Sequence, residues 1–321
     1  MNNSMIYRVY NKEFKVIPFT AYDRELLIDL QSKVSQYFDT ELFTENYHEV
    51  IVLSGSESII LADESQYPEL GKINRVWRNL NRSYKIFWRE WQEAVNRYLD
   101  PLDYTEGVFR LAGYSRVYVL LTDYINSENQ VYKIHCGIEF LLIYLESMEG
   151  AVMFHSCCGG FRNDDLYLFI GQSGVGKSTI ADKIIKDCGY VVDDERNFVV
   201  RRNDLYQVFS GQNEAISKAV GCSNLESGEL KKILFIHQSL EEFVEETTPD
   251  DENFNKIIVA NKEVGGYRET FPKFIKKLNK YFIWELLHHL PVYNIYLRKD
   301  SDIRELLSDI SCKNNKEGVV T

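Results

Sequence analysis

The sequence predicts a mixed α/β fold, and three observations lead to that prediction. Short apolar runs alternate with stretches of helical spacing along most of the chain. A glycine-rich segment, Gly171–Ser178, directly follows the apolar run Leu166–Ile170 and precedes a helical stretch. Hydrophobic residues make up 45% of the 321 residues, which is enough for a sizeable core. We therefore expect an α/β domain at 131–321, preceded by a smaller α+β region at 1–130.

The N-terminal region is expected to consist of short strands and helices. Alternating apolar residues predict strands, and an apolar spacing near 3.6 residues predicts helices. One predicted helix, Asn74–Leu99, carries three tryptophans that are expected to anchor packing, because buried aromatic side chains dominate cores. The expected strands are a pair in Met5–Pro18, two runs in Glu49–Ala62, Arg116–Leu121 and Gln130–His135, and a further helix is expected at Arg24–Phe38.

The remaining residues alternate between predicted helices and strands, as a layered α/β domain requires. The helix after the glycine-rich segment is expected at Lys177–Asp187, with Gly189 as the residue that ends it. Glu241–Glu252 holds seven acidic residues and no basic one, which predicts a solvated loop, and the tail after Ile310 is expected to fray. The other expected helices are Ile138–Met148 and Phe271–Leu290, and the expected strands are Val152–Cys157, Leu166–Ile170, Tyr190–Val192, Phe198–Arg202, Tyr206–Phe209, Lys232–Gln238 and Pro291–Leu297.

Charge and cysteine content argue against several classes of function. The chain has 37 Lys and Arg against 48 Asp and Glu, and its formal charge of −11 argues against nucleic acid or an anionic membrane as partner. No apolar run reaches the ~20 residues of a membrane helix, and the N-terminal stretch lacks the apolar segment of a signal peptide. The 6 cysteines form no C-x-x-C pair, as expected of free thiols in a reducing compartment. A cytoplasmic protein is expected, and homo-oligomerisation stays open.

The segment Gly171–Ser178 matches the pattern G-x-x-x-x-G-K-[ST] at every fixed position. Its glycines allow the backbone to present successive N–H groups to phosphate oxygens. Lys177 is expected to bring a positive charge to the phosphates, and Ser178 to bind Mg²⁺. The positive end of the following helix dipole points at the same place. We therefore predict a nucleotide phosphate site, with contacts from Gly171, Ser173, Gly174, Val175, Gly176, Lys177, Ser178 and Thr179.

Three adjacent acids, Asp193, Asp194 and Glu195, stand at the end of the next predicted strand. Sixteen residues separate Lys177 from Asp193, which is enough for one helix and a return to the sheet. Carboxylates at that strand end would lie near the phosphates, where they could hold Mg²⁺ or accept a proton from an attacking hydroxyl. Adjacent acids repel one another unless a cation lies beside them, although a solvated turn explains the same pattern.

These elements together resemble the kinase domain of the HPr serine kinase/phosphorylase family and its divergent relatives, among them kinases of the C-terminal serine of lasso precursor peptides. That family has a histidine on a strand, an apolar strand, the glycine-rich loop, a helix ending in glycine, and an acidic pair. The resemblance covers roughly residues 136–300. The matching segments are Phe154-His155-Ser156, Leu166–Ile170, Gly171–Ser178, Gly189–Glu195, Leu230–Gln238 and Leu290–Leu297.

Departures from the family pattern count against HPr itself as the acceptor. Gln172 stands where the HPr kinases usually have an acidic residue, and Gly265–Arg268 is only a faint counterpart of their late glycine- and arginine-rich signature. The stretch from Gly189 to the acids is also shorter than in that family. The functional pair is therefore either Asp193 with Asp194 or Asp194 with Glu195.

The resemblance implies a P-loop kinase domain of the HPr kinase/phosphoenolpyruvate carboxykinase type. It implies ATP- and Mg²⁺-dependent transfer of the γ-phosphoryl group to a serine-type hydroxyl of a peptide, protein or small molecule. The N-terminal region lies outside the resemblance and, as the additional part of the chain, is expected to recruit that substrate. A nucleotide-dependent switch or ATPase without an acceptor, and a non-catalytic nucleotide-binding protein, remain alternatives, and ATP is not distinguished from GTP. The implied catalytic residues are Asp194, Asp193, His155 and Lys177, and the implied metal ligands are Ser178, Asp194 and Glu195.

Overall fold

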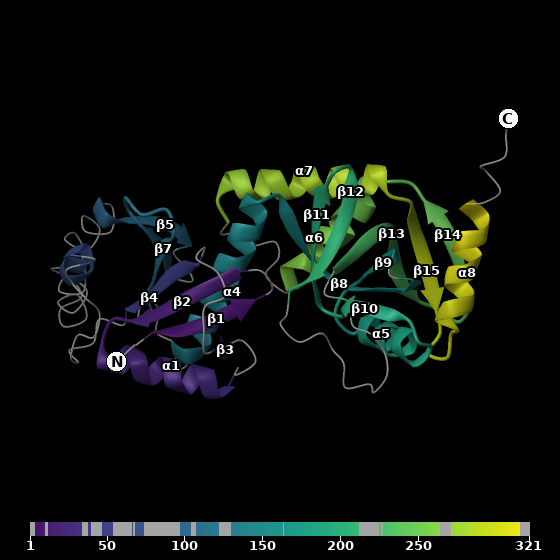
Figure 1. The fold of residues 1–321 in the computed structure, drawn as a ribbon. Helices are drawn as coiled ribbons and strands as arrows, with labels where there is room; N and C mark the ends of the chain where they lie inside the picture. The colour runs from purple at the N-terminus through teal and green to yellow at the C-terminus, as the bar shows by residue number, and fades with distance from the viewer. Residues whose placement is uncertain are drawn as a thin grey trace. The chain divides into compact units, whose positions relative to one another are not determined.

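The chain forms two compact units, residues 1–142 with 270–272 and residues 143–269 with 273–321. Each unit contains one β-sheet, which confirms the mixed α/β class (Figure 1). The assignment of 1–130 and 131–321 to separate domains stays a prediction. The computed structural model describes residues 4–9, 12–33, 38–39, 47–53, 66, 68–73, 97–103, 107–121, 130–162, 164–211, 225, 227–263 and 271–314.

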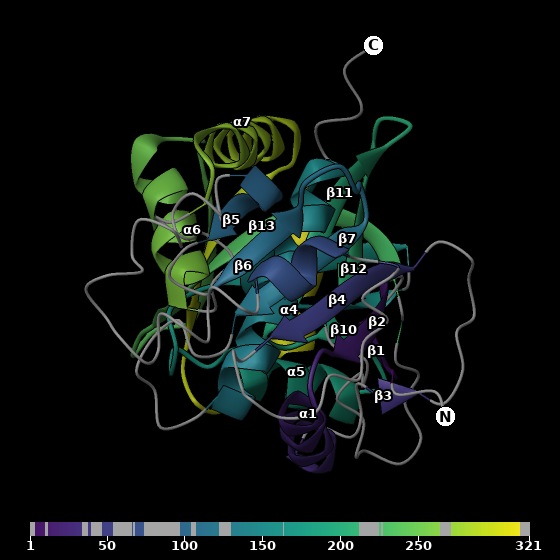
Figure 2. The same ribbon diagram turned by 90° about the vertical axis from the view of Figure 1, so that its left-hand side faces the viewer.

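The first unit holds a 7-stranded sheet in the order β3-β1-β2-β4-β7-β6-β5 (Figure 2). β4 runs parallel to both β2 and β7, and the other neighbouring strands are antiparallel. Helix α1 packs against β2. The elements are β1 (Met5–Val9), β2 (Lys12–Pro18), α1 (Ala21–Lys33), β3 (Phe38–Asp39), β4 (His48–Leu53), β5 (Leu99–Asp103), β6 (Val108–Leu111), β7 (Val117–Leu121) and, up to Leu142, α4 (Gln130–Met148).

The strand predicted at Gln130–His135 is wrong, because these residues form the first turns of α4. Val131, Ile134 and Ile138 are all buried, and their separations of three and four residues are those of one helix face. The spacing of the buried residues, rather than local β propensity, decides the element.

Helix α1 begins at Ala21, before the predicted start at Arg24, because Thr20 and Asp23 cap its first turn reciprocally. The Thr20 N–H donates to Asp23 Oδ2 at 2.8 Å, and the Asp23 N–H donates to Thr20 Oγ1 at 3.3 Å. The predicted strand pair in Met5–Pro18 is confirmed. Residues 54–65 and 74–96, which hold the second predicted β-rich run and the three tryptophans, lie outside the described residues.

The second unit holds an 8-stranded sheet, and every strand predicted in it from an apolar run is present. Helices α5, α6, α7 and α8 belong to the same unit. The elements are β8 (Ala151–Arg162), β9 (Asp165–Ile170), α5 (Lys177–Lys186), β10 (Tyr190–Asp193), β11 (Arg196–Arg202), β12 (Leu205–Ser210), β13 (Ser227–Gln238), β14 (Phe243–Thr247), α6 (Asp251–Glu263), α7 (Lys273–His289), β15 (Val292–Leu297) and α8 (Ile303–Asn314).

Five strands of this sheet form a closed ring of pairings, in the order β8, β11, β12, β13 and β9. β9 pairs with β8 and with β13, while β11 and β12 connect the same two strands by a second route. β9, β13 and β15 run parallel, so their carboxyl ends meet at one edge of the sheet. In open α/β sheets this edge is where ligands bind.

Alternate side chains of the central strands enter two different cores, one on each face of the sheet. On β9, Leu168 and Ile170 join the core beneath α6 and α7, whereas Tyr167 and Phe169 join the core beneath α5 and α8. Figure 1 shows α7 and α5 on opposite sides of the strands. Burial on both faces explains why the β9 sequence is a continuous apolar run.

Two predictions about irregular segments in this unit are wrong. Glu241–Glu252 is not a loop throughout, because it contains β14, paired antiparallel with β15, and the start of α6 at Asp251. The side chains of β14 are exposed or half-buried, as on many edge strands, so its acids still face water. Helix α8 continues past Ile310 to Asn314, so the tail is not frayed from Ile310 onward, and residues 315–321 lie outside the described residues.

The end of α5 also differs from the prediction. Its last helical residue is Lys186, and Cys188 rather than Gly189 takes the left-handed conformation, with φ of 59°. Gly189 is required for another reason: a Cβ there would lie 2.7 Å from the carbonyl oxygen of Gly160. The chain thus turns back tightly from α5 into β10.

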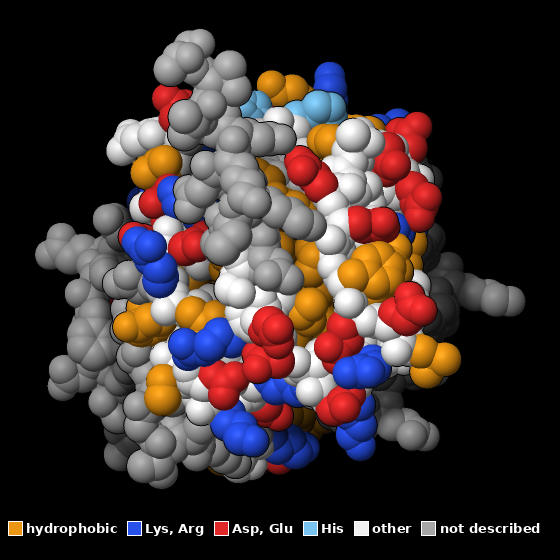
Figure 3. Space-filling view, turned by 90° about the vertical axis from the view of Figure 1, so that its right-hand side faces the viewer, with side chains coloured by type: hydrophobic (Ala, Val, Ile, Leu, Met, Phe, Trp, Pro, Cys, Tyr) orange, Lys and Arg blue, Asp and Glu red, His pale blue; other side chains and the backbone are white. Residues whose placement is uncertain are grey.

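Acidic and basic side chains are interspersed on the face that carries β14 and α8 (Figure 3). The pair of Arg298 Nε with Glu242 Oε1, 3.0 Å apart, is one example. None of the helices within the described ranges has the length and apolar character needed to cross a bilayer. Free thiols are present at Cys136, Cys157, Cys158 and Cys188.

Asn261 fastens α6 to β8. Its amide Nδ2 donates to the carbonyl oxygen of Met153 at 2.8 Å, and its Oδ1 accepts from the His155 N–H at 2.9 Å. The side chain is 1% exposed, so water cannot replace either bond.

Replacing this amide, Asn261→Ala, is expected to lower the free energy of unfolding by about 2 kcal/mol, because two buried backbone groups lose their partners. Urea unfolding followed by circular dichroism would measure the change. Asn255→Ala, on an exposed position of the same helix, is the matched control and should change stability by less than about 0.5 kcal/mol. Equal losses in the two variants would contradict the assigned role.

Candidate functional site

The glycine-rich loop runs from Gly171 to Gly176, between the end of β9 and the start of α5. Gly174 and Gly176 have φ of +80° and +115°, which L side chains rarely adopt. At Gly171, a Cβ would lie 2.6 Å from Cγ1 of Val175. These three positions therefore need glycine for the loop to take this shape.

The Lys177 ammonium group is hydrogen-bonded to the backbone of the loop. Its Nζ donates to the carbonyl oxygens of Gly171 at 2.8 Å and Gln172 at 3.1 Å, and the residue is only 7% exposed. Burial lowers the pKa of Lys177, although the nearby negative charge of Glu263 opposes the shift. The positive charge is thus held at the first turn of α5, where the helix dipole is also positive.

The register of the sheet brings the loop and the acids together around β8. Ser156 of β8 is opposite Ile170 of β9, and the adjacent His155 is opposite Arg196 of β11. The loop therefore leaves on one side of this strand while the turn between β10 and β11, which carries the acids, lies on the other.

Asp193 shapes that turn. Its Oδ1 accepts from the N–H groups of Glu195 at 2.8 Å and Arg196 at 3.0 Å, and its Oδ2 accepts from the Ser210 hydroxyl at 2.6 Å. The residue is 1% exposed, and burial raises its pKa to about 6 against the opposing effect of these hydrogen bonds. With its oxygens engaged inside the turn, Asp193 fixes the backbone that presents the next two acids.

Asp194 faces the loop. Burial raises its pKa, and a hydrogen bond from the Ser178 side chain opposes that rise. A hydroxyl and a carboxylate that stand together at the start of α5 are both hard oxygen ligands.

His155 is held at the same place by one backbone and one side-chain contact of its ring. Its Nδ1 lies 3.2 Å from the carbonyl oxygen of Ala260 and 3.1 Å from Oε2 of Glu263. Because both partners are acceptors, Nδ1 carries the proton, and Nε2 of the neutral ring is left as an acceptor. Burial and the nearby Lys177 charge lower the pKa of His155, which favours this neutral form.

Glu263, at the end of α6, reaches the loop with its carboxylate. Its Oε2 accepts from the Ser173 backbone N–H at 2.8 Å, in addition to its contact with His155. An internal anion therefore lies against one of the loop N–H groups predicted to bind phosphate. Sequence reasoning missed this residue, because 90 positions separate it from Ser173 and no motif includes it.

A cavity of about 330 Å³ opens between the loop and the acid-bearing turn. Of the predicted site residues, Asp193, Gly171 and Val175 do not line it. Glu263, the carboxylate that touches the loop, is not among its lining residues either. Those that do line it are His155, Ser173, Gly174, Gly176, Lys177, Ser178, Thr179, Asp194 and Glu195.

The donor set fits magnesium held jointly with a phosphate. Within the described parts of the chain, no three His, Cys, Asp or Glu side chains are grouped to hold a metal on their own. The Ser178 hydroxyl and the Asp194 carboxylate offer two oxygens, with Glu195 beside them on the cavity wall. Mg²⁺ ordinarily binds through one or two carboxylates while phosphates and water supply the rest.

No family model matches the sequence, and no curated protein matches it. Among solved structures, the chain is similar to the HPr(Ser) kinase/phosphatase from Coxiella burnetii, with a TM-score of 0.29 and 9% identity over 51% of this chain and 97% of that chain. A likeness at this TM-score and identity assigns no function to this chain.

The buried Asp193 predicts a pH-dependent stability. Because its folded pKa of about 6 lies above the ordinary aspartate value of 3.8, its contribution to stability is largest below pH 3.8 and is lost as pH rises through 6. Asp193→Asn keeps an acceptor for the turn and removes the titration. The free energy of unfolding of this variant, relative to that of the parent, should rise by about 1 kcal/mol from pH 5 to pH 8. Urea unfolding in metal-free buffer would measure it. A difference that stays constant with pH would contradict this assignment.

Proposed function

We propose that the second unit is an ATP- and Mg²⁺-dependent P-loop kinase that transfers the γ-phosphoryl group to a serine-type hydroxyl. One observation carries the proposal: Lys177, Ser178 and Asp194 line a single cavity with the glycines of a loop that precedes a helix N-terminus. A phosphate-binding loop with an adjacent carboxylate is the arrangement that phosphoryl transfer uses.

Each residue would have a distinct role. The loop N–H groups and Lys177 bind the phosphates and neutralise their charge, while Ser178 and Asp194 would hold Mg²⁺. Bound ATP would supply the phosphoryl group and leave as ADP, and Mg²⁺ would supply positive charge beside the phosphate oxygens. Asp194 or Glu195 accepts the proton of the acceptor hydroxyl, and Asp193 positions both. His155 lines the same cavity, and its neutral ring would orient the acids beside it. Most of the acceleration comes from positioning and charge neutralisation.

The acceptor class rests on the resemblance of residues 136–300 to HPr-kinase-like proteins, which act on serine-type hydroxyls. A peptide, a protein or a small molecule fits that class. We assign substrate recruitment to the N-terminal unit and a cytoplasmic location to the protein, as the sequence suggests. The departures at Gln172 and at 265–268, the latter outside the described residues, favour an acceptor other than HPr.

In this proposal the Glu263 carboxylate competes with the nucleotide. It already accepts the Ser173 N–H that a phosphate would use, and its negative charge opposes the approach of a polyanion. About a third of its side chain is exposed, so it can move toward water when phosphate arrives.

Transfer of label from γ-³²P-ATP in the presence of Mg²⁺ to a candidate peptide or to serine tests the proposal. Lys177→Ala should lower transfer at least about 100-fold, because a charge next to the transferred group is lost. Asp194→Asn should lower transfer by a similar factor, while its ATP affinity stays within about threefold of that of the unaltered protein. Lys186→Ala, at the exposed end of the same helix, is the control.

If free phosphate is released and none of the tested acceptors becomes labelled, the result would favour an ATPase instead. Retained transfer in Lys177→Ala would refute the kinase assignment.

Removal of the competing charge gives a second test. Glu263→Gln should tighten binding of ATP and of inorganic tripolyphosphate about three- to tenfold in isothermal titration calorimetry, because a neutral amide competes less with phosphate. Asp251→Asn, on the first turn of the same helix, makes the same charge change at an exposed residue that lines none of the three cavities around the loop, and it should leave binding unchanged. Weaker binding in Glu263→Gln would show that Glu263 helps to bind the ligand rather than competing with it.

A further inference from the structure

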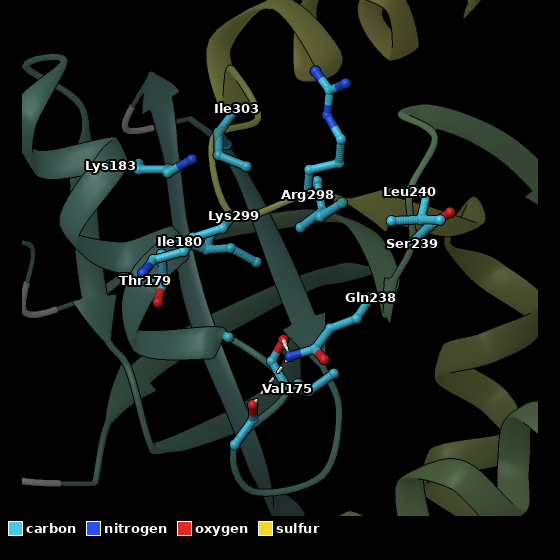
Figure 4. A pocket seen from close by; sticks show the side chains of 13 residues that line it. Val175, Thr179, Ile180, Lys183, Gln238, Ser239, Leu240, Arg298, Lys299 and Ile303 are labelled. Atoms are coloured by element: carbon cyan, nitrogen blue, oxygen red, sulfur yellow. Dashed lines mark hydrogen bonds between the residues drawn. The ribbon is translucent and has the colours of Figure 1, made fainter.

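A second cavity, of about 520 Å³, lies beside the same loop (Figure 4). It opens at the carboxyl ends of β13 and β15 and is bounded by α5 and the start of α8. Its size is in the range of cavities that take cofactor-sized ligands. We call it the β13–β15 cavity.

The lining of the β13–β15 cavity is mainly apolar with a basic rim. The apolar side chains are Val175, Ile180, Leu240, Leu297 and Ile303, and the cations are Lys183, Arg298 and Lys299. No acidic residue lines it, although Glu242 pairs with Arg298 at 3.0 Å from outside the lining. Apolar walls beside cations suit a flat aromatic ring attached to an anionic group.

Leu240 is exposed, unlike most of the apolar side chains that line this cavity. It is 92% exposed, whereas Ile180, Leu297 and Ile303 are between 2% and 8% exposed. A large apolar side chain at the mouth of a cavity leaves surface that a ligand ring can cover.

The β13–β15 cavity shares part of its wall with the charged cavity of the predicted phosphate site. Gly174, Gly176 and Thr179 line both this cavity and the charged cavity that holds Lys177 and Asp194. The amide of Gln238, at the end of β13, donates to the carbonyl oxygens of Gly174 at 3.3 Å and Val175 at 3.4 Å, which ties the cavity wall to the loop (Figure 4).

A neighbouring cavity of about 490 Å³ is the competing candidate. It lies between the loop and α6, and Phe235, Lys256 and Val259 are among its lining residues. It shares no lining residue with the charged cavity, and an acid, Glu252, lines it. The competing cavity and the charged cavity therefore have no wall in common along which one ligand could extend from one to the other.

The geometry points to the β13–β15 cavity as the site for the nucleoside part of the nucleotide. The inference rests on the proposed function and extends it by placing the base and ribose. The base would lie among Val175, Ile180 and Leu240, and the phosphates would extend past Thr179 into the charged cavity. The acceptor is then left to approach from the side of Asp194 and Glu195.

Photolabelling of the full chain with 8-azido-ATP tests the placement directly. We expect label in the peptides that contain residues 238–240 or 297–303, and protection by excess ATP. Label in residues 252–259, the α6 side of the competing cavity, would overturn the inference.

A pair of matched substitutions gives an independent measurement. Leu240→Ala should weaken ATP binding about three- to tenfold and leave tripolyphosphate binding unchanged, because only the nucleoside contact is reduced. The control is Val259→Ala, an apolar side chain, 43% exposed, that lines the competing cavity and should change neither affinity. Weaker ATP binding in Val259→Ala, with unchanged ATP binding in Leu240→Ala, would overturn the inference. Failure of the unaltered protein to bind either ATP or tripolyphosphate would instead overturn the proposed function.

Discussion

The pairing of β8 with strands on both of its edges is the constraint on which the candidate site depends. Ser156 is opposite the last residue of β9, and the adjacent His155 is opposite the first residue of β11. This register brings the glycine-rich loop and the acid-bearing turn to one point on β8, although a whole helix separates them in the chain. A shift of one residue in the pairing of β8 with either neighbour would turn the side chains of the shifted strand to the other face of the sheet. The closed ring of five strands resists such a shift, because β9 cannot slide without breaking its parallel pairing to β13.

The charged groups at this point are held partly out of water, and burial is the largest cause of each shift. It lowers the pKa values of Lys177 and His155 and raises that of Asp194, so each is displaced toward its neutral form. A phosphate beside Lys177 and a cation beside Asp194 would reverse these displacements. The internal contacts of Lys177 with the loop carbonyls and of Glu263 with Ser173 satisfy the same groups without a ligand. Ligand binding would therefore exchange these contacts rather than fill an unpaired site.

The three cavities around the loop differ in chemistry. The one between the loop and the acids is polar, whereas the β13–β15 cavity is apolar with a basic rim, and these two share Gly174, Gly176 and Thr179. The third cavity shares Val175 with the β13–β15 cavity and no lining residue with the polar one. A ligand with an aromatic end and a polyanionic end matches that division. The net charge of −11 says little about this region, because seven acidic residues lie in Glu241–Glu252, at the edge strand β14 and the start of α6.

The sequence by itself determined the strand β9, the loop and the start of α5, because an apolar run and the glycine, lysine and serine positions are local signals. It also placed three acids at the end of β10. It could not determine that Asp193 is turned into the protein while Asp194 faces the loop, since that depends on the buried Ser210 hydroxyl, 17 positions away. Nor could it locate Glu263 at Ser173, or show that Gln130–His135 begins a helix. These features depend on contacts between distant segments, and only the tertiary structure decides which of those segments meet.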